Sequence, residues 1–173
     1  MFDYATFAYL ALLSFPAAMT FAGFNDMVSL TIPNKLSLFL IAAFLVAAAA
    51  VQMPLDRFGL HLAVGFTMLV IMMTLWAFGF LGGGDAKLIA VASLWIGFDD
   101  LPLFVAYVAI FGGLLCLVVL SYRQMMPPRW AFQHEWALRL HEKTGGVPYG
   151  LAIGSAGLVL FPMTHWFKAV AAI

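Results

Sequence analysis

Residues Leu101–Ser121 read LPLFVAYVAIFGGLLCLVVLS, an apolar run without a single charged side chain. A helix needs about 20 mainly apolar residues to cross the hydrocarbon layer of a bilayer. The run is therefore long enough for a transmembrane helix, and the rest of the chain has to be compatible with a membrane.

The remainder of the chain has the same character. Of its 173 residues, 65% are hydrophobic and 9% are charged, whereas soluble domains carry about a quarter charged residues. Apolar runs broken by Pro, Gly or charge predict five further spans, at Tyr4–Phe24, Leu36–Val51, Leu60–Leu81, Lys87–Phe98 and Tyr149–Met163. We expect an all-α helix bundle of about six transmembrane helices, with residues 1–173 forming one membrane-embedded domain. The short span Lys87–Phe98 either crosses incompletely or recruits Leu101–Pro102.

The distribution of charge predicts the orientation, because Lys and Arg near helix ends stay in the cytoplasm. Eight basic residues balance eight acidic ones, so net charge indicates no nucleic-acid partner. We expect both termini to be non-cytoplasmic, with the bilayer as the surrounding partner. The basic residues of the cytoplasmic connections are Lys35, Lys87, Arg123, Arg129, Arg139 and Lys143, against Arg57 and Lys168 outside, where Asp3, Asp56, Asp99 and Asp100 also fall.

The fifth connection, residues 122–146, has the composition of a soluble segment. Within it Phe132, Trp136 and Leu140 recur every four residues opposite polar side chains. That spacing is typical of an amphipathic helix lying in the membrane interface. We therefore expect one such helix in this cytoplasmic loop.

Asp26 and Asp85 are the acids that this topology places at cytoplasmic ends of spanning helices. A carboxylate at membrane depth costs several kcal/mol unless it is paired, neutralised or hydrated. Two neighbouring carboxylates share one proton and can activate a water molecule for peptide hydrolysis, one as base and the other as acid. Asp85 opens a helix and Asp26 follows one, so the helix dipoles favour Asp85 as the ionised partner.

The flanking residues admit plainer explanations when each motif is taken alone. Asp85 follows Gly82-Gly83-Gly84 and precedes Lys87, which would also suit an N-cap after a flexible turn. Ile32-Pro33-Asn34 follows Asp26 and would also suit the end of an extended segment and the cap of the next helix.

Taken together, these motifs resemble the prepilin peptidases, a family of GxGD intramembrane aspartic proteases (peptidase family A24). The likeness rests on Asp26 with Ile32-Pro33-Asn34, on Gly82-x-Gly84-Asp85-x-Lys87, and on Val147-Pro148-Tyr149-Gly150-Leu151-Ala152-Ile153. The resemblance implies that Asp26 and Asp85 are the catalytic pair of a multi-pass protein of the cytoplasmic (inner) membrane. It also implies that the pair cleaves the basic leader of type IV prepilins or pseudopilins at the cytoplasmic face. Supporting roles fall to Gly82, Gly84, Lys87 and Asn34, and the substrate-binding residues stay open.

Longer members of that family carry paired CxxC motifs that bind zinc and accompany N-methylation. This chain has Cys116 alone, so it resembles the short form of Tad-type (Flp) pilus systems, and we expect cleavage without methyl transfer. The archaeal preflagellin peptidases are also short and stay open as an alternative. We expect no cofactor and no metal, because His61, His134, His141 and His165 do not form a ligand set.

Two other classes remain as alternatives. A small transporter or pilus assembly component would use Asp26 and Asp85 as a proton relay, but such pathways usually have acids at mid-helix depth. A presenilin-like GxGD protease would cut within spans, and Ile32-Pro33-Asn34 favours the prepilin branch instead. The oligomeric state is left open.

Overall fold

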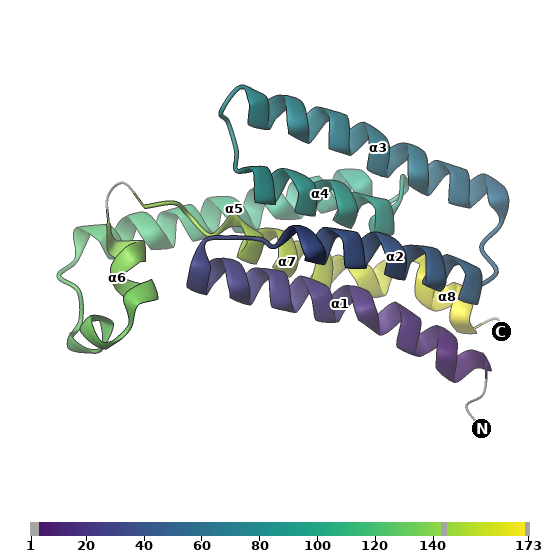
Figure 1. The fold of residues 1–173 in the computed structure, drawn as a ribbon, viewed down its shortest axis with the longest axis horizontal. Helices are drawn as coiled ribbons and strands as arrows, with labels where there is room; N and C mark the ends of the chain where they lie inside the picture. Colours follow the sequence, from purple (N-terminus) through teal and green to yellow (C-terminus); the bar gives the residue numbers. More distant parts are fainter. Residues whose placement is uncertain (1–3, 143–144, 172–173) are drawn as a thin grey trace.

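A computed structural model describes residues 4–142 and 145–171. The expectations for Asp3 and Lys143 lie outside these residues. The described chain is helical throughout, without a strand, and its long helices run side by side as a bundle (Figure 1). The elements are α1 (Tyr4–Ser29), α2 (Asn34–Ala50), α3 (Leu55–Ala77), α4 (Gly83–Ile96), α5 (Leu101–Gln124), η1 (Arg129–Gln133), α6 (Glu135–His141), α7 (Tyr149–Leu160), η2 (Phe161–Met163) and α8 (His165–Ala171).

Length and composition make the chain a polytopic membrane helix bundle. Within the described residues, four helical stretches are long and apolar enough to cross a bilayer, namely Thr6–Ser29, Leu55–Ala77, Leu101–Gln124 and Tyr149–Val170. The apolar helix α2 is shorter. Helix α4 has 14 residues and spans roughly 21 Å at 1.5 Å per residue, less than the 30 Å hydrocarbon layer. It therefore crosses incompletely, and it does not recruit Leu101, because Gly97 ends it with φ +81°.

Several predicted boundaries were wrong. Helix α1 continues five residues beyond Phe24 to Ser29, so Asp26 lies in its last turn rather than after its end. Helix α3 begins at Leu55 rather than Leu60 and ends at Ala77 rather than Leu81. Helix α4 begins at Gly83 rather than Lys87, so Asp85 lies in its first turn.

The expected helix through Phe132, Trp136 and Leu140 is interrupted. His134 adopts an extended conformation, φ −132° and ψ 110°, between η1 and α6. The interruption lets the rings of Trp130 and Trp136 approach to 6.0 Å between centroids. Phe132 therefore does not share a helix with the other two side chains.

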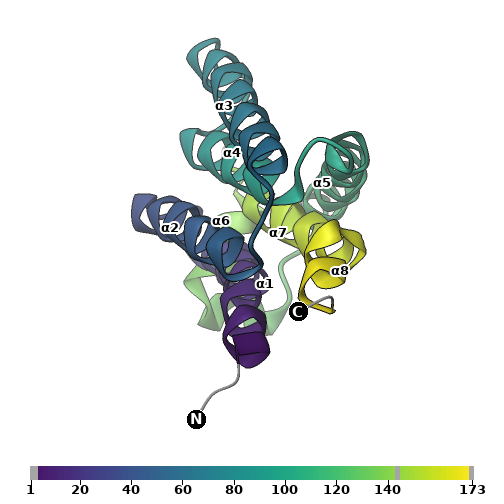
Figure 2. The same ribbon diagram turned by 90° about the vertical axis from the view of Figure 1, so that its right-hand side faces the viewer.

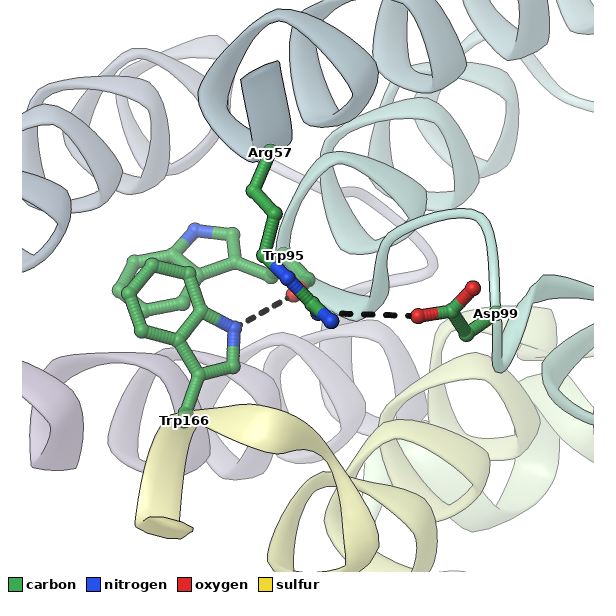
Figure 3. A network of polar contacts seen from close by, with 4 residues as sticks. All are labelled: Arg57, Trp95, Asp99 and Trp166. Atoms are coloured by element: carbon green, nitrogen blue, oxygen red, sulfur yellow. Dashed lines mark hydrogen bonds and ion pairs between the residues drawn. The ribbon is translucent and has the colours of Figure 1, made fainter. Parts of the chain in front are cut away.

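An aromatic cluster forms the core at the end of the bundle that lies away from α6. Phe15, Phe44, Trp95, Phe161 and Trp166 are all fully buried. Two indole N–H groups are satisfied by backbone carbonyls. Trp95 Nε1 donates to Leu40 O at 3.0 Å. Trp166 Nε1 donates to Trp95 O at 2.7 Å, a bond that Figure 3 shows. The second bond ties α8 to α4. Figure 2 shows the helices of the bundle nearly end-on, with α4 and α8 both labelled.

Helices α1 and α7 pack at close range. A Cβ atom at Gly154 would lie 2.6 Å from the carbonyl oxygen of Met19, and one at Gly23 would lie 3.2 Å from the Cα atom of Leu151. Glycine at such positions lets two backbones approach each other. This contact sets the position of the first turn of α7 against the last turns of α1.

We predict that Gly154→Ala destabilises the bundle. Replacing a helical glycine by alanine normally stabilises a helix by about 0.5–1 kcal/mol, but here the methyl group would force α1 and α7 apart at a cost of about 1–3 kcal/mol. Gly113→Ala is the matched control, because a Cβ atom at Gly113 of α5 meets nothing within 4 Å. Thermal unfolding in detergent should give a lower midpoint for Gly154→Ala than for Gly113→Ala, and equal midpoints would contradict the close contact.

Candidate functional site

Asp26 and Asp85 lie at the same end of the bundle, the end away from both termini (Figure 1). Asp26 belongs to the last turn of α1, and Asp85 belongs to the first turn of α4. Both line one cavity of about 810 Å³. The other lining residues come mainly from the irregular segments between helices: Leu30, Thr31 and Ile32; Gly79, Phe80, Leu81 and Gly82; Gly146 and Val147; with Gly83, Gly84, Ile89, Val108, Tyr149 and Ile153 from the helices.

The Asp26 carboxylate is held by the start of α7. Its side chain is 5% exposed, and the backbone N–H of Gly150 donates a hydrogen bond to Asp26 Oδ2 at 2.7 Å. A Cβ atom at Gly150 would lie 2.8 Å from Asp26 Cβ, so only glycine permits this approach. The sequence motif around Gly150 was recognised, but its role as the donor to Asp26 was missed.

Two opposing effects act on the Asp85 carboxyl. The dipole of a helix start favours its ionised form by about 0.3–1 kcal/mol. Burial, together with the charge of Asp26, favours the protonated form and raises the pKa of the carboxyl to about 7. The assignment of Asp85 as the ionised partner from the helix dipole alone therefore leaves out the larger effects of burial and of the neighbouring charge.

Two motif glycines lie against the carboxylate and its neighbours. A Cβ atom at Gly82 would lie 2.9 Å from Asp85 Oδ2, and one at Gly84 would lie 3.1 Å from Ile32 Cβ. A larger residue at either position would push against the carboxylate or against the segment that follows α1. The glycines therefore set how closely the turn before α4 approaches the cavity.

The supporting residues Lys87 and Asn34 contact each other. Lys87 Nζ donates a hydrogen bond to Asn34 Oδ1 at 2.9 Å. Since Asn34 begins α2 and Lys87 lies in α4, the bond ties together two helix starts beside the cavity. Lys87 does not line the cavity itself.

The segment between α1 and α2 is fixed by polar side chains of α1. Leu30 adopts φ +51°, a turn that sends Thr31 and Ile32 along the cavity wall. Asn25 Nδ2 donates to Thr31 O at 2.7 Å and to Ser29 Oγ at 3.1 Å. These bonds hold the extended segment next to Asp26.

The opposite wall is held from α5. Arg123 donates through Nη2 to the carbonyl oxygens of Gly145 at 2.6 Å and Gly146 at 3.0 Å. Farther along α5, Cys116 Sγ lies 3.1 Å from the hydroxyl of Tyr149. Arg123 and the contact between Cys116 and Tyr149 thus position the segment that leads into α7 and the first residues of that helix, which include Gly150.

A family model supports the motif-based resemblance. The model of the type IV leader peptidase family matches residues 13–117, a range that contains Asp26, Asn34, Asp85 and Lys87. Neither a search of curated proteins nor a search of solved structures finds a match. Because the family model covers more than half of this membrane-spanning bundle, the chain belongs to the type IV leader peptidase family.

Proposed function

We propose that the chain is a membrane aspartic endopeptidase that removes the short basic leader from type IV prepilins or pseudopilins of the Flp/Tad kind. Cleavage takes place at the cytoplasmic face and is not followed by N-methylation. The observation that carries the proposal is the shared cavity of Asp26 and Asp85 in a chain of the leader peptidase family. The orientation follows from the basic residues near this end of the bundle, among them Lys35, Arg123 and Arg139.

The chemistry assigns different roles to the two carboxyl groups. Asp85 is the acid, because the pKa of its carboxyl is raised to about 7. Asp26 is the base, with Oδ2 oriented by the hydrogen bond from Gly150. Asp26 takes a proton from a water molecule as its oxygen attacks the scissile carbonyl carbon, and Asp85 donates its proton to the carbonyl oxygen. As the tetrahedral intermediate collapses and the C–N bond breaks, protonated Asp26 gives its proton to the leaving amine nitrogen, and Asp85 recovers a proton from a hydroxyl of the intermediate, which restores both carboxyl groups.

The cavity suits an extended peptide next to an apolar helix. Its walls include the irregular segments at Thr31–Ile32 and Gly146–Val147, whose backbone can pair with a substrate strand. Ile89, Val108 and Ile153 supply apolar walls deeper in the bundle. A precursor whose leader is polar and whose next segment is apolar would meet both kinds of surface in turn.

We predict that Asp26→Asn and Asp85→Asn each abolish leader removal, at least 100-fold, because either change removes the base or the acid. The measurement is co-expression with a Flp-type precursor and determination of its N-terminus by mass spectrometry. Asp56→Asn, an exposed acid at the other end of the bundle, is the control and should cleave normally. Processing by either site variant, once correctly inserted, would refute the aspartic mechanism.

We also predict that cleavage declines as the pH rises through about 7. Below that value the Asp85 carboxyl keeps the proton that it donates, and above it the proton is lost. Initial rates of the purified protein between pH 5 and 9, with thermal unfolding followed in parallel, test this. A rate that rises through pH 7 to a plateau would reverse the assigned roles.

The bond between Lys87 and Asn34 predicts a modest effect. Lys87→Met and Asn34→Ala should each lower the cleavage rate by about three- to tenfold, since the bond positions helix starts and touches no reacting atom. The double variant should be no slower than the slower single variant. If the double variant instead loses rate by the product of the two single-variant factors, Lys87 and Asn34 act independently.

A further inference from the structure

A second site lies at the end of the bundle opposite Asp26 and Asp85. A cavity of about 340 Å³ is lined by Arg57 of α3 and by His165 and Lys168 of α8. Both basic side chains available at this end in the described chain, Arg57 and Lys168, therefore meet at one cavity. Three nitrogen-bearing groups from two helices face a space within the usual range of small-ligand sites.

The side chains of Arg57, His165 and Lys168 have hydrogen-bonding groups that no other part of the described chain satisfies. Arg57 Nη1 pairs with Asp99 Oδ2 at 3.7 Å, with both side chains largely exposed (Figure 3), which leaves most of its five donors unused. Lys168 has no ion-pair partner within residues 4–142 and 145–171. His165 Nε2 is buried and has no hydrogen-bond partner in the same residues, although buried polar atoms are normally satisfied.

The positions of the three groups are set by the core. Trp166, next to His165, donates to Trp95 O at 2.7 Å, and the His165 ring lies 4.9 Å from the His61 ring, centroid to centroid. Figure 3 shows Arg57 extending from α3 toward Asp99, with which it forms an ion pair. The site is therefore anchored to a rigid part of the bundle.

An apolar groove continues from the basic cavity. Met53 lines the cavity and also a groove of about 250 Å³ along α2 and α3. The groove is walled by Leu45, Ala48, Leu55 and Phe58. A cationic cavity that leads into an apolar groove along two membrane helices matches a phosphate group with acyl chains attached.

We propose that this cavity and groove bind a phospholipid of the surrounding membrane, with its phosphodiester at Arg57, His165 and Lys168 and an acyl chain along Met53 and Phe58. Charge complementarity supports this arrangement. The lining of the cavity contains the cations of Arg57 and Lys168 and no carboxylate, whereas the nearby carboxylates Asp56 and Asp99 line a neighbouring cavity that shares Arg57. The site is independent of the proposed peptidase chemistry, since it shares no lining residue with the Asp26–Asp85 cavity.

The test measures thermal unfolding of the purified full chain in a neutral detergent with added dioctanoyl phosphatidylglycerol. We expect a saturable rise in Tm of about 5 °C at roughly a 100-fold excess over Kd. Lys168→Gln and Arg57→Gln should each lose at least half of the rise. Lys35→Gln, an exposed lysine at the other end of the bundle, is the matched control and should keep it.

Two further ligands distinguish the sources of the shift. Dioctanoylglycerol carries the chains without the phosphate, and sodium phosphate carries the charge without the chains, and each should give less than half of the effect. An equal rise with dioctanoylglycerol, an equal rise with phosphate alone, or an unchanged rise in both Lys168→Gln and Arg57→Gln would each overturn the proposal. Each variant is first shown to be folded by its own unfolding transition without lipid. If Lys168→Gln does not fold, the result for Arg57→Gln alone tests the proposal.

Discussion

The hydrogen bond from the Gly150 amide to the Asp26 carboxylate is the contact on which the proposed active-site end of the bundle depends. It joins residues 124 positions apart and is possible only because α1 and α7 pack glycine against backbone along their length. A buried carboxylate without a partner would cost several kcal/mol. The close packing of the two helices therefore determines whether Asp26 is tolerated at all, and with it where the cavity opens.

The other contacts around the cavity complete this arrangement from separate helices. Arg123 of α5 holds Gly145 and Gly146, Lys87 of α4 holds Asn34 of α2, and Asn25 holds Thr31. The bonds of Arg123 and Asn25 fix irregular segments to helices, and the bond of Lys87 joins two helix starts, so the cavity is built from loops on a rigid frame. Such a frame leaves backbone groups accessible to a peptide while the carboxyl groups stay in place.

The sequence predicted the spans and the pair of carboxyl groups because both depend on local features. Apolar runs of about 20 residues identify spans without reference to neighbours, and Asp26 and Asp85 were distinctive because of their place at helix ends. The continuation of α1 to Ser29 was missed, since Asn25 and Ser29 look like loop residues until their bonds to Thr31 are seen. The Gly150 donor, the break at His134 and the raised pKa of Asp85 depend on residues far apart in the chain or on burial, and no local pattern carries that information.

The shortness of α4 has a consequence for how water reaches the carboxyl groups. Its 14 residues leave about 9 Å of a 30 Å hydrocarbon layer uncovered, and the uncovered part adjoins the turn that carries Gly82 and Asp85. Neighbouring helices rather than lipid surround this helix, because its residues from Ala90 to Ile96 are all buried, so the bilayer need not thin around it. The depth that α4 leaves uncovered adjoins the cavity that Asp26 and Asp85 line, and water in that cavity would reach the carboxyl groups without crossing hydrocarbon.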